Sequence, residues 1–243
     1  MPADARSILS QLDIVSRERE LRAVDSSLAR AVVDLKEYQQ RRFCLTYADL
    51  LASPRYAAAA RFFLDELYGP KDFSERDAQF ARVVPALVRL FPQEIVETVD
   101  VLARLHALSE TLDTMMARQL IGGPVVRSAY VRAWQATGDE ALREQQIALT
   151  LTIGRELDRL TRKPLLRRTL HLMRAPARAA GLPALQQFLE TGFDTFKAMG
   201  GADSFLSTVG ERERRLARAL FETPPESALP ISPSALDPLG QLP

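Results

Sequence analysis

Apolar residues recur every three to four positions along most of this chain, and this spacing constrains the fold more than any other feature. Across residues 7–51 they stand at Leu21, Val24, Leu28, Val32 and Leu35. That spacing is typical of one face of an amphipathic α-helix. No stretch combines strict alternation with the β-branched enrichment of a strand. The sequence therefore predicts an all-α protein, an irregular bundle of about eight or nine helices.

Proline, glycine and capping residues predict where the helices begin and end. Gly69-Pro70 is expected to end one helix, and Ser74 with Asp77 forms the S-x-x-D pattern of a capping box for the next. Pro85 lies inside that second helix, where a kink or a break is expected. Asp139 follows a glycine and is predicted to cap a later helix.

The helical pattern predicts one domain over residues 1–222, with a weaker possible boundary at Gly122-Gly123. Residues 223–243 differ in composition, because they hold six of the chain's 15 prolines and little periodicity. A segment of this kind is expected to form a disordered tail.

Composition excludes several functional classes. The 32 basic and 31 acidic residues leave almost no net charge, so no global field favours nucleic acid or an anionic membrane. Charged residues interrupt every apolar stretch well short of the roughly 18 residues that a membrane span needs. The single cysteine, Cys44, fits a reducing compartment. We expect a cytoplasmic protein with no membrane partner.

The stretch FFLDELYGPKDF, residues 62–73, gathers aromatic and acidic residues around a turn. We interpret it as a packed corner between two helices, in which Phe63 is core. The alternative is a divalent cation held by nearby carboxylates, although Lys71 and Arg76 can neutralise them. The carboxylates concerned are Asp65, Glu66, Asp72 and Asp77.

The same stretch carries a resemblance. Together with VVPALVRLFP and ALSETLDTMM, it resembles an uncharacterised all-helical family of bacterial proteins marked by an FFL-x-x-LYG-x-x-D-F motif. The likeness covers at least residues 43–120 and continues to about Phe221. It implies no activity, ligand or catalytic residue.

His106 is one of two histidines and shares a helix flank with Glu110 and Asp113, four and seven residues further on. A histidine near carboxylates can bind a metal or act as a general base. However, Ala103 stands where a di-iron bundle requires the glutamate of Glu-x-x-His. We therefore expect His106 to bond to Glu110, and keep a metal site at His106, Glu110 and Asp113 as an alternative.

Residues 155–178 hold eight basic side chains and two acidic ones, the strongest local charge signal in the chain. Such a face suits an acidic protein partner or nucleic acid, but it lacks the aromatic residues of a single-strand groove. The predicted partner-binding residues are Arg159, Arg162, Lys163, Arg167, Arg168 and Arg174.

Phe188, Leu189, Phe193 and Phe196 recur at helical spacing near the C-terminal end of the helical region. We expect them to be core, with a groove for a small apolar ligand or a partner helix as the alternative. The sequence contains no Walker A, G-x-S-x-G, H-E-x-x-H or C-x-x-C motif.

These observations predict no cofactor and no catalytic residue. The preferred function is a non-enzymatic helical interaction or regulatory module that binds a protein or a second copy of itself. A metal- or cofactor-binding protein and a nucleic-acid-binding protein are the alternatives.

Overall fold

The computed structural model describes residues 3–66, 73–224 and 238–243. These residues form helices α1 to α12 and one short 3-10 helix, η2, without any β-strand, which confirms the all-α class. The helices outnumber the eight or nine predicted, because short segments such as α3 and α10 are separate helices. The bounds are α1 (Ala5–Ala23), α2 (Ser26–Thr46), α3 (Ala48–Ala52), α4 (Ala57–Glu66), α5 (Ser74–Leu90), α6 (Gln93–Arg118), α7 (Arg127–Thr137), α8 (Glu140–Thr161), α9 (Pro164–Leu172), α10 (Arg174–Ala179), α11 (Pro183–Met199), α12 (Asp203–Glu222) and η2 (Pro238–Gln241).

The apolar pattern across residues 7–51 belongs to more than one helix. The chain turns between α1 and α2, where Asp25 accepts hydrogen bonds from the backbone N–H groups of Ser27 and Leu28 at 2.9 and 3.0 Å. An aspartate in this position caps the new helix. Because of this turn, Leu21 and Val24 are exposed although they continue the apolar spacing, whereas Leu28 is buried.

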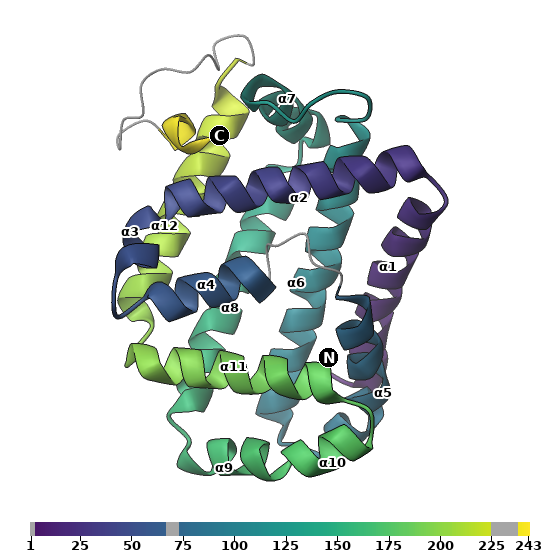
Figure 1. Cartoon of the computed structure of the whole chain (residues 1–243), viewed down its shortest axis with the longest axis vertical. Coiled ribbons are helices and arrows are strands. Elements are labelled where there is room, and N and C mark those ends of the chain that lie inside the picture. The colour runs from purple at the N-terminus through teal and green to yellow at the C-terminus, as the bar shows by residue number, and fades with distance from the viewer. Residues whose placement is uncertain (1–2, 67–72, 225–237) are drawn as a thin grey trace.

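Helices α6, α8 and α12 run side by side along the long axis of the molecule, and α2, α4 and α11 cross in front of them (Figure 1). Helix α1 packs against α6 along one edge, with α5 beside it. The short helices α9 and α10 lie at one end, next to α11.

Three groups of buried residues form the core. One joins α2, α6, α7 and α12 around Tyr38 and Tyr130, whose rings stack 4.7 Å apart. A second joins α2, α4, α11 and α12 around Phe63 and Phe205. A third packs α1 against α5 and α6. The candidate site lies among these groups.

The prediction of a disordered tail over residues 223–243 is wrong for its last six residues. Leu239 and Leu242 are buried in the same group as Tyr38 and Tyr130. The hydroxyl of Tyr38 donates to the carbonyl of Pro243 at 3.3 Å. The burial of two leucines offsets part of the conformational entropy that the short segment loses. Residues 225–237, which belong to the same prediction, lie outside the described residues.

Local capping rules succeed at one predicted helix start and fail at another. Asp139 accepts from the N–H of Leu142 at 3.0 Å, as predicted. Helix α5 begins at Ser74, but the carboxylate of Asp77 turns away from the helix end and bonds to Arg19 and His106. Helix α5 continues through Pro85, so the break that was one of the two expectations at this proline does not occur. Gly69-Pro70 lies outside the described residues.

Helices from both sides of Gly122-Gly123 pack together, since α6 contacts α8 and α4 contacts α11. This packing favours one domain over two, and the single-domain assignment stays a prediction. None of the described helices combines the length and apolar character that crossing a membrane requires.

Candidate functional site

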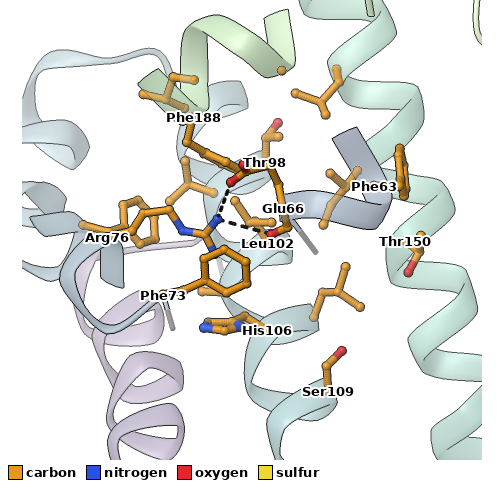
Figure 2. Close-up of a pocket in the computed structure, with 18 of the residues that line it drawn as sticks. Phe63, Glu66, Phe73, Arg76, Thr98, Leu102, His106, Ser109, Thr150 and Phe188 are labelled. Carbon is orange, nitrogen blue, oxygen red and sulfur yellow. Dashed lines mark hydrogen bonds and ion pairs between the residues drawn. The ribbon is translucent and has the colours of Figure 1, made fainter. Parts of the chain in front are cut away.

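A cavity of about 560 Å³ lies between the two layers of helices. Side chains from α4, α5, α6, α8, α9 and α11 line it, and most of its wall is apolar. Figure 2 shows Arg76 and His106 on one side of this space and Phe63 and Thr150 on the opposite side. Long helices that cross at an angle bring these distant segments to one place.

The motif stretch supplies part of the cavity wall. Phe62 and Phe63 line the cavity and are buried; Phe62 stacks on Phe188 with 5.5 Å between ring centroids. Phe188, Leu189 and Phe193 line the same space from α11, but the prediction that Leu189 is core is wrong, because its side chain is 42% exposed. The aromatic residues expected to be core therefore also border a cavity, as in the apolar-ligand alternative. Residues 67–72 of the motif lie outside the described residues.

Arg76 is held between two aromatic rings at the cavity wall. Its guanidinium carbon lies 4.0 Å from the ring centroid of Phe73 and 4.6 Å from that of Phe188 (Figure 2). Nη1 donates to the side chain and the carbonyl of Glu66 at 3.4 and 3.3 Å. Burial lowers the pKa of Arg76, and the charges of Asp77 and Glu66 offset only part of this effect.

His106 does not bond to Glu110 as expected. Its Nε2 lies 2.7 Å from Oδ2 of Asp77, and Arg19 donates to the same oxygen at 2.6 Å. Burial acts to raise the pKa of Asp77, but the hydrogen bond from His106 and the charges of Arg19 and Arg76 outweigh it and lower the pKa. The carboxylate orients the imidazole at the cavity wall. The prediction failed because the acidic partner comes from α5, 29 residues away in the sequence.

Glu110 belongs to a buried ion-pair network instead. It pairs with Arg22 from α1, whose Nη2 also donates to the Glu110 carbonyl at 2.6 Å, and with Lys36 from α2 at 2.7 Å. Burial acts to raise the pKa of Glu110, but the charges of Lys36 and Arg22 outweigh it and lower the pKa to about 2. Glu110 is therefore an ionised structural group.

Asp113 lies at the edge of this network. It accepts from Gln39 at 3.1 Å, and Nζ of Lys36 lies 3.7 Å away. Its burial outweighs the charge of Lys36 and raises its pKa.

The metal-site alternative at His106, Glu110 and Asp113 gains no support from this geometry. His106 bonds to Asp77, whereas Glu110 and Asp113 both face Lys36. The described residues contain no group of three or more histidine, cysteine or acidic side chains arranged to hold a metal. In the second proposed carboxylate cluster, Asp65 is exposed and Glu66 and Asp77 face Arg76. Asp72 and Lys71 lie outside the described residues.

Polar side chains on the far wall complete the site. Gln146 donates to the hydroxyl of Ser109 at 2.9 Å, and the hydroxyl of Thr150 bonds within its own helix. Sequence reasoning missed Arg76, Ser109 and Gln146 as site residues. No local signal marks them, because each looks like an ordinary polar residue on an amphipathic helix.

Most of the basic residues predicted to bind a partner at residues 155–178 are paired with acidic side chains. Glu94 from α6 pairs with Arg159 and Lys163, and two acidic residues of α11 pair with Arg167 and Arg174. Arg162, which directly follows α8, pairs with Asp158 of that helix at 2.5 Å. Among the described contacts, Arg168 alone of the six predicted residues has no ion pair. The eight basic and two acidic residues of the segment sum to +6, and the three acidic residues that pair with it from α6 and α11 lower this sum to +3. The acidic residues are Glu94, Glu156, Asp158, Glu190 and Asp194.

Comparison with known proteins places the chain in a family. The model of the family described as Domain of unknown function (DUF8198) matches residues 18–227, and the chain belongs to that family. This confirms the expected membership in an uncharacterised family, and the all-helical structure agrees with it. No curated protein and no solved structure matches the chain.

Proposed function

We propose that this member of the family is a non-enzymatic regulatory or carrier module that binds a small, largely apolar molecule in its central cavity. The observation that carries the proposal is the cavity itself, about 560 Å³ in volume and walled mainly by aromatic and aliphatic side chains. Binding sites for small molecules have volumes of about 300–1,000 Å³ and a few polar groups in an apolar wall.

The size of the cavity argues against a packing defect. Protein interiors are packed as densely as organic crystals, and their voids are small. A volume of about 560 Å³ is far larger than the water-sized voids of such an interior. A ligand-binding role accounts for a cavity of this size.

The polar groups of the wall are few and lie on defined positions. Arg76 and His106 stand on one side, and Ser109 and Thr150 stand elsewhere on the wall (Figure 2). Asp77 also lines the cavity, next to His106. A small number of fixed polar groups in an apolar wall sets the orientation of a bound molecule.

A bulky substitution inside the cavity tests this proposal. Leu102 lines the cavity on α6, and Leu102→Trp is expected to weaken binding of the neutral fluorescent probe N-phenyl-1-naphthylamine at least tenfold. The indole ring would occupy the space that the probe needs. The measurement is a fluorescence titration of the purified wild-type and variant proteins.

Leu172→Trp is the matched control, because Leu172 is 76% exposed and outside the cavity wall. Its probe affinity should equal that of the wild type. A wild-type protein that does not bind the probe saturably, or a Leu102→Trp variant that binds it equally well, contradicts the proposal. Native mass spectrometry of gently purified protein adds a second readout, since a retained ligand appears as extra mass.

A second candidate function is self-association through α9. Leu165 and Leu172 lie seven residues apart on this helix and are 70% and 76% exposed. Residues with this spacing lie on the same side of a helix. Arg168 lies between them in sequence. Exposed apolar groups at one end of the molecule favour a protein contact, here a second copy of the chain.

If this surface joins two copies, changing both leucines to serine should convert a dimer to a monomer in sedimentation velocity experiments. Val24→Ser is the control, because Val24 is equally apolar and exposed but lies between α1 and α2. A wild-type chain that stays monomeric at high concentration would exclude this candidate. Nucleic-acid binding is less favoured for this region, because most of its predicted basic residues are already paired with acidic side chains.

The proposal places the protein in the bacterial cytoplasm. Support for the source is the resemblance carried by the FFL-x-x-LYG-x-x-D-F motif. Support for the compartment is the single free, half-buried Cys44, which fits reducing conditions.

A further inference from the structure

Arg76 differs from the other buried cations near the cavity in how its charge is balanced. Its side chain is only 13% exposed. The nearest carboxylate oxygens lie 3.4 Å away on Glu66 and 3.7 Å away on Asp77. Arg22, by contrast, donates four hydrogen bonds to Glu110 and Thr114. Arg76 is therefore a buried cation whose acidic partners lie farther away than those of Arg22.

The carboxylate of Asp77 is already engaged by closer partners. Its Oδ2 lies 2.6 Å from Arg19 and 2.7 Å from His106, while Arg76 faces the other oxygen at long range. Among the described residues, only Nη1 of Arg76 donates hydrogen bonds, and both go to Glu66. Nε faces Oδ1 of Asp77 at 3.7 Å, so Nη2 is the donor of Arg76 that is open to another acceptor.

The two phenylalanine rings define the direction from which an acceptor can arrive. Phe73 and Phe188 cover the guanidinium within 4.0 and 4.6 Å of its carbon. Stacking of this kind leaves the N–H groups at the edge of the planar guanidinium for hydrogen bonds. In Figure 2 the guanidinium reaches into the pocket between the two rings. The planar fork of arginine suits two oxygens of one carboxylate.

We infer that the cavity binds a long-chain carboxylate, with the carboxylate on Arg76 and the apolar chain along the wall toward Phe63. This inference rests on the proposed binding function and specifies the chemical class of its ligand. The apolar wall accounts for the chain, and the incompletely paired Arg76 accounts for the acid group. Charge-assisted hydrogen bonds are stronger than neutral ones, so an acid should bind better than an alcohol of equal length.

The test compares dodecanoate with 1-dodecanol as competitors for bound N-phenyl-1-naphthylamine. We expect wild-type protein to bind dodecanoate about 10- to 100-fold more tightly, the range for hydrogen bonds between charged groups. In Arg76→Gln this preference should disappear while the affinity for 1-dodecanol stays within about twofold of the wild type. Binding of 1-dodecanol also reports that the variant cavity is intact.

Arg89→Gln is the matched control, because Arg89 lies on the same helix, is exposed and does not line the cavity. Arg89→Gln should keep the full preference for dodecanoate. If this variant loses the preference, the preference comes from the net charge of the protein rather than from Arg76, and the inference is overturned. If Arg76→Gln does not fold, Arg76→Lys replaces it and should show a reduced preference. An Arg76→Lys variant with the unchanged wild-type preference would overturn the role of the guanidinium fork.

The wild-type result separates the two proposals. Equal affinity for dodecanoate and 1-dodecanol overturns the carboxylate inference and leaves the apolar binding function intact. If neither compound competes and the probe itself does not bind, the binding function fails and the inference falls with it.

Discussion

Replacing Glu110 by alanine is expected to lower the free energy of unfolding by roughly 3–5 kcal/mol, the usual loss when one partner of a buried ion pair is removed. Glu110 is the carboxylate to which Arg22 and Lys36 both bind. Without it, two largely buried cations lose their shared counter-charge. These contacts also join α1 and α2 to α6, so their loss weakens the packing of three helices. Chemical denaturation followed by circular dichroism measures the effect.

Glu97→Ala is the matched control, since Glu97 lies on the same helix and is exposed. Its stability should stay within about 0.5 kcal/mol of the wild type, as for most surface substitutions. A Glu110→Ala variant that loses less than about 1 kcal/mol would mean that Arg22 and Lys36 do not depend on this carboxylate.

The pH dependence of stability gives an independent check on Glu110. Its pKa is about 2 in the folded protein against a usual value of 4.5, so its ionised form is favoured by folding. The resulting stabilisation is complete above about pH 4.5 and is lost as the pH falls toward 2. That stabilisation is roughly 3 kcal/mol. The wild type should therefore lose more stability than Glu110→Gln between neutral pH and pH 3.

Phe63→Ala is also expected to cost roughly 3–5 kcal/mol, as do other truncations of large buried aromatic residues. Phe63 is 3% exposed, and its ring lies 6.1 Å from that of Phe196 and 5.7 Å from that of Phe205. The substitution removes contacts that join α4 to α11 and α12. Thermal and denaturant unfolding monitored by circular dichroism measure the loss.

Two further variants test whether the loss of stability comes from the buried ring of Phe63. Asp65→Asn, two residues away and exposed, should leave stability nearly unchanged. Phe63→Leu should cost less than Phe63→Ala, because leucine fills more of the space. A small loss in Phe63→Ala, or a large one in Asp65→Asn, would reverse the interpretation of this stretch as a packed corner.

Features that depend on neighbouring residues were accessible from the sequence. The three-to-four spacing predicted helices, because burying one face of a helix requires apolar residues at that period. Asp139 was predicted as a cap because capping uses a backbone N–H only three residues away. Asp25 is a capping residue of the same kind, but no helix start was predicted there, because the apolar spacing continues across the turn between α1 and α2.

The pairing of side chains across helices depended on tertiary structure alone. His106 bonds to Asp77 rather than Glu110, and Arg22 reaches Glu110 from 88 positions away. The acidic residues that pair with the basic residues of the 155–178 segment come from α6 and α11 as well as from α8. The sequence by itself determined that this chain is helical and which faces of its helices are apolar, because those properties are local. Only the tertiary structure decided which faces meet, and the crossing of the helix layers created the cavity and placed Arg76 in its wall.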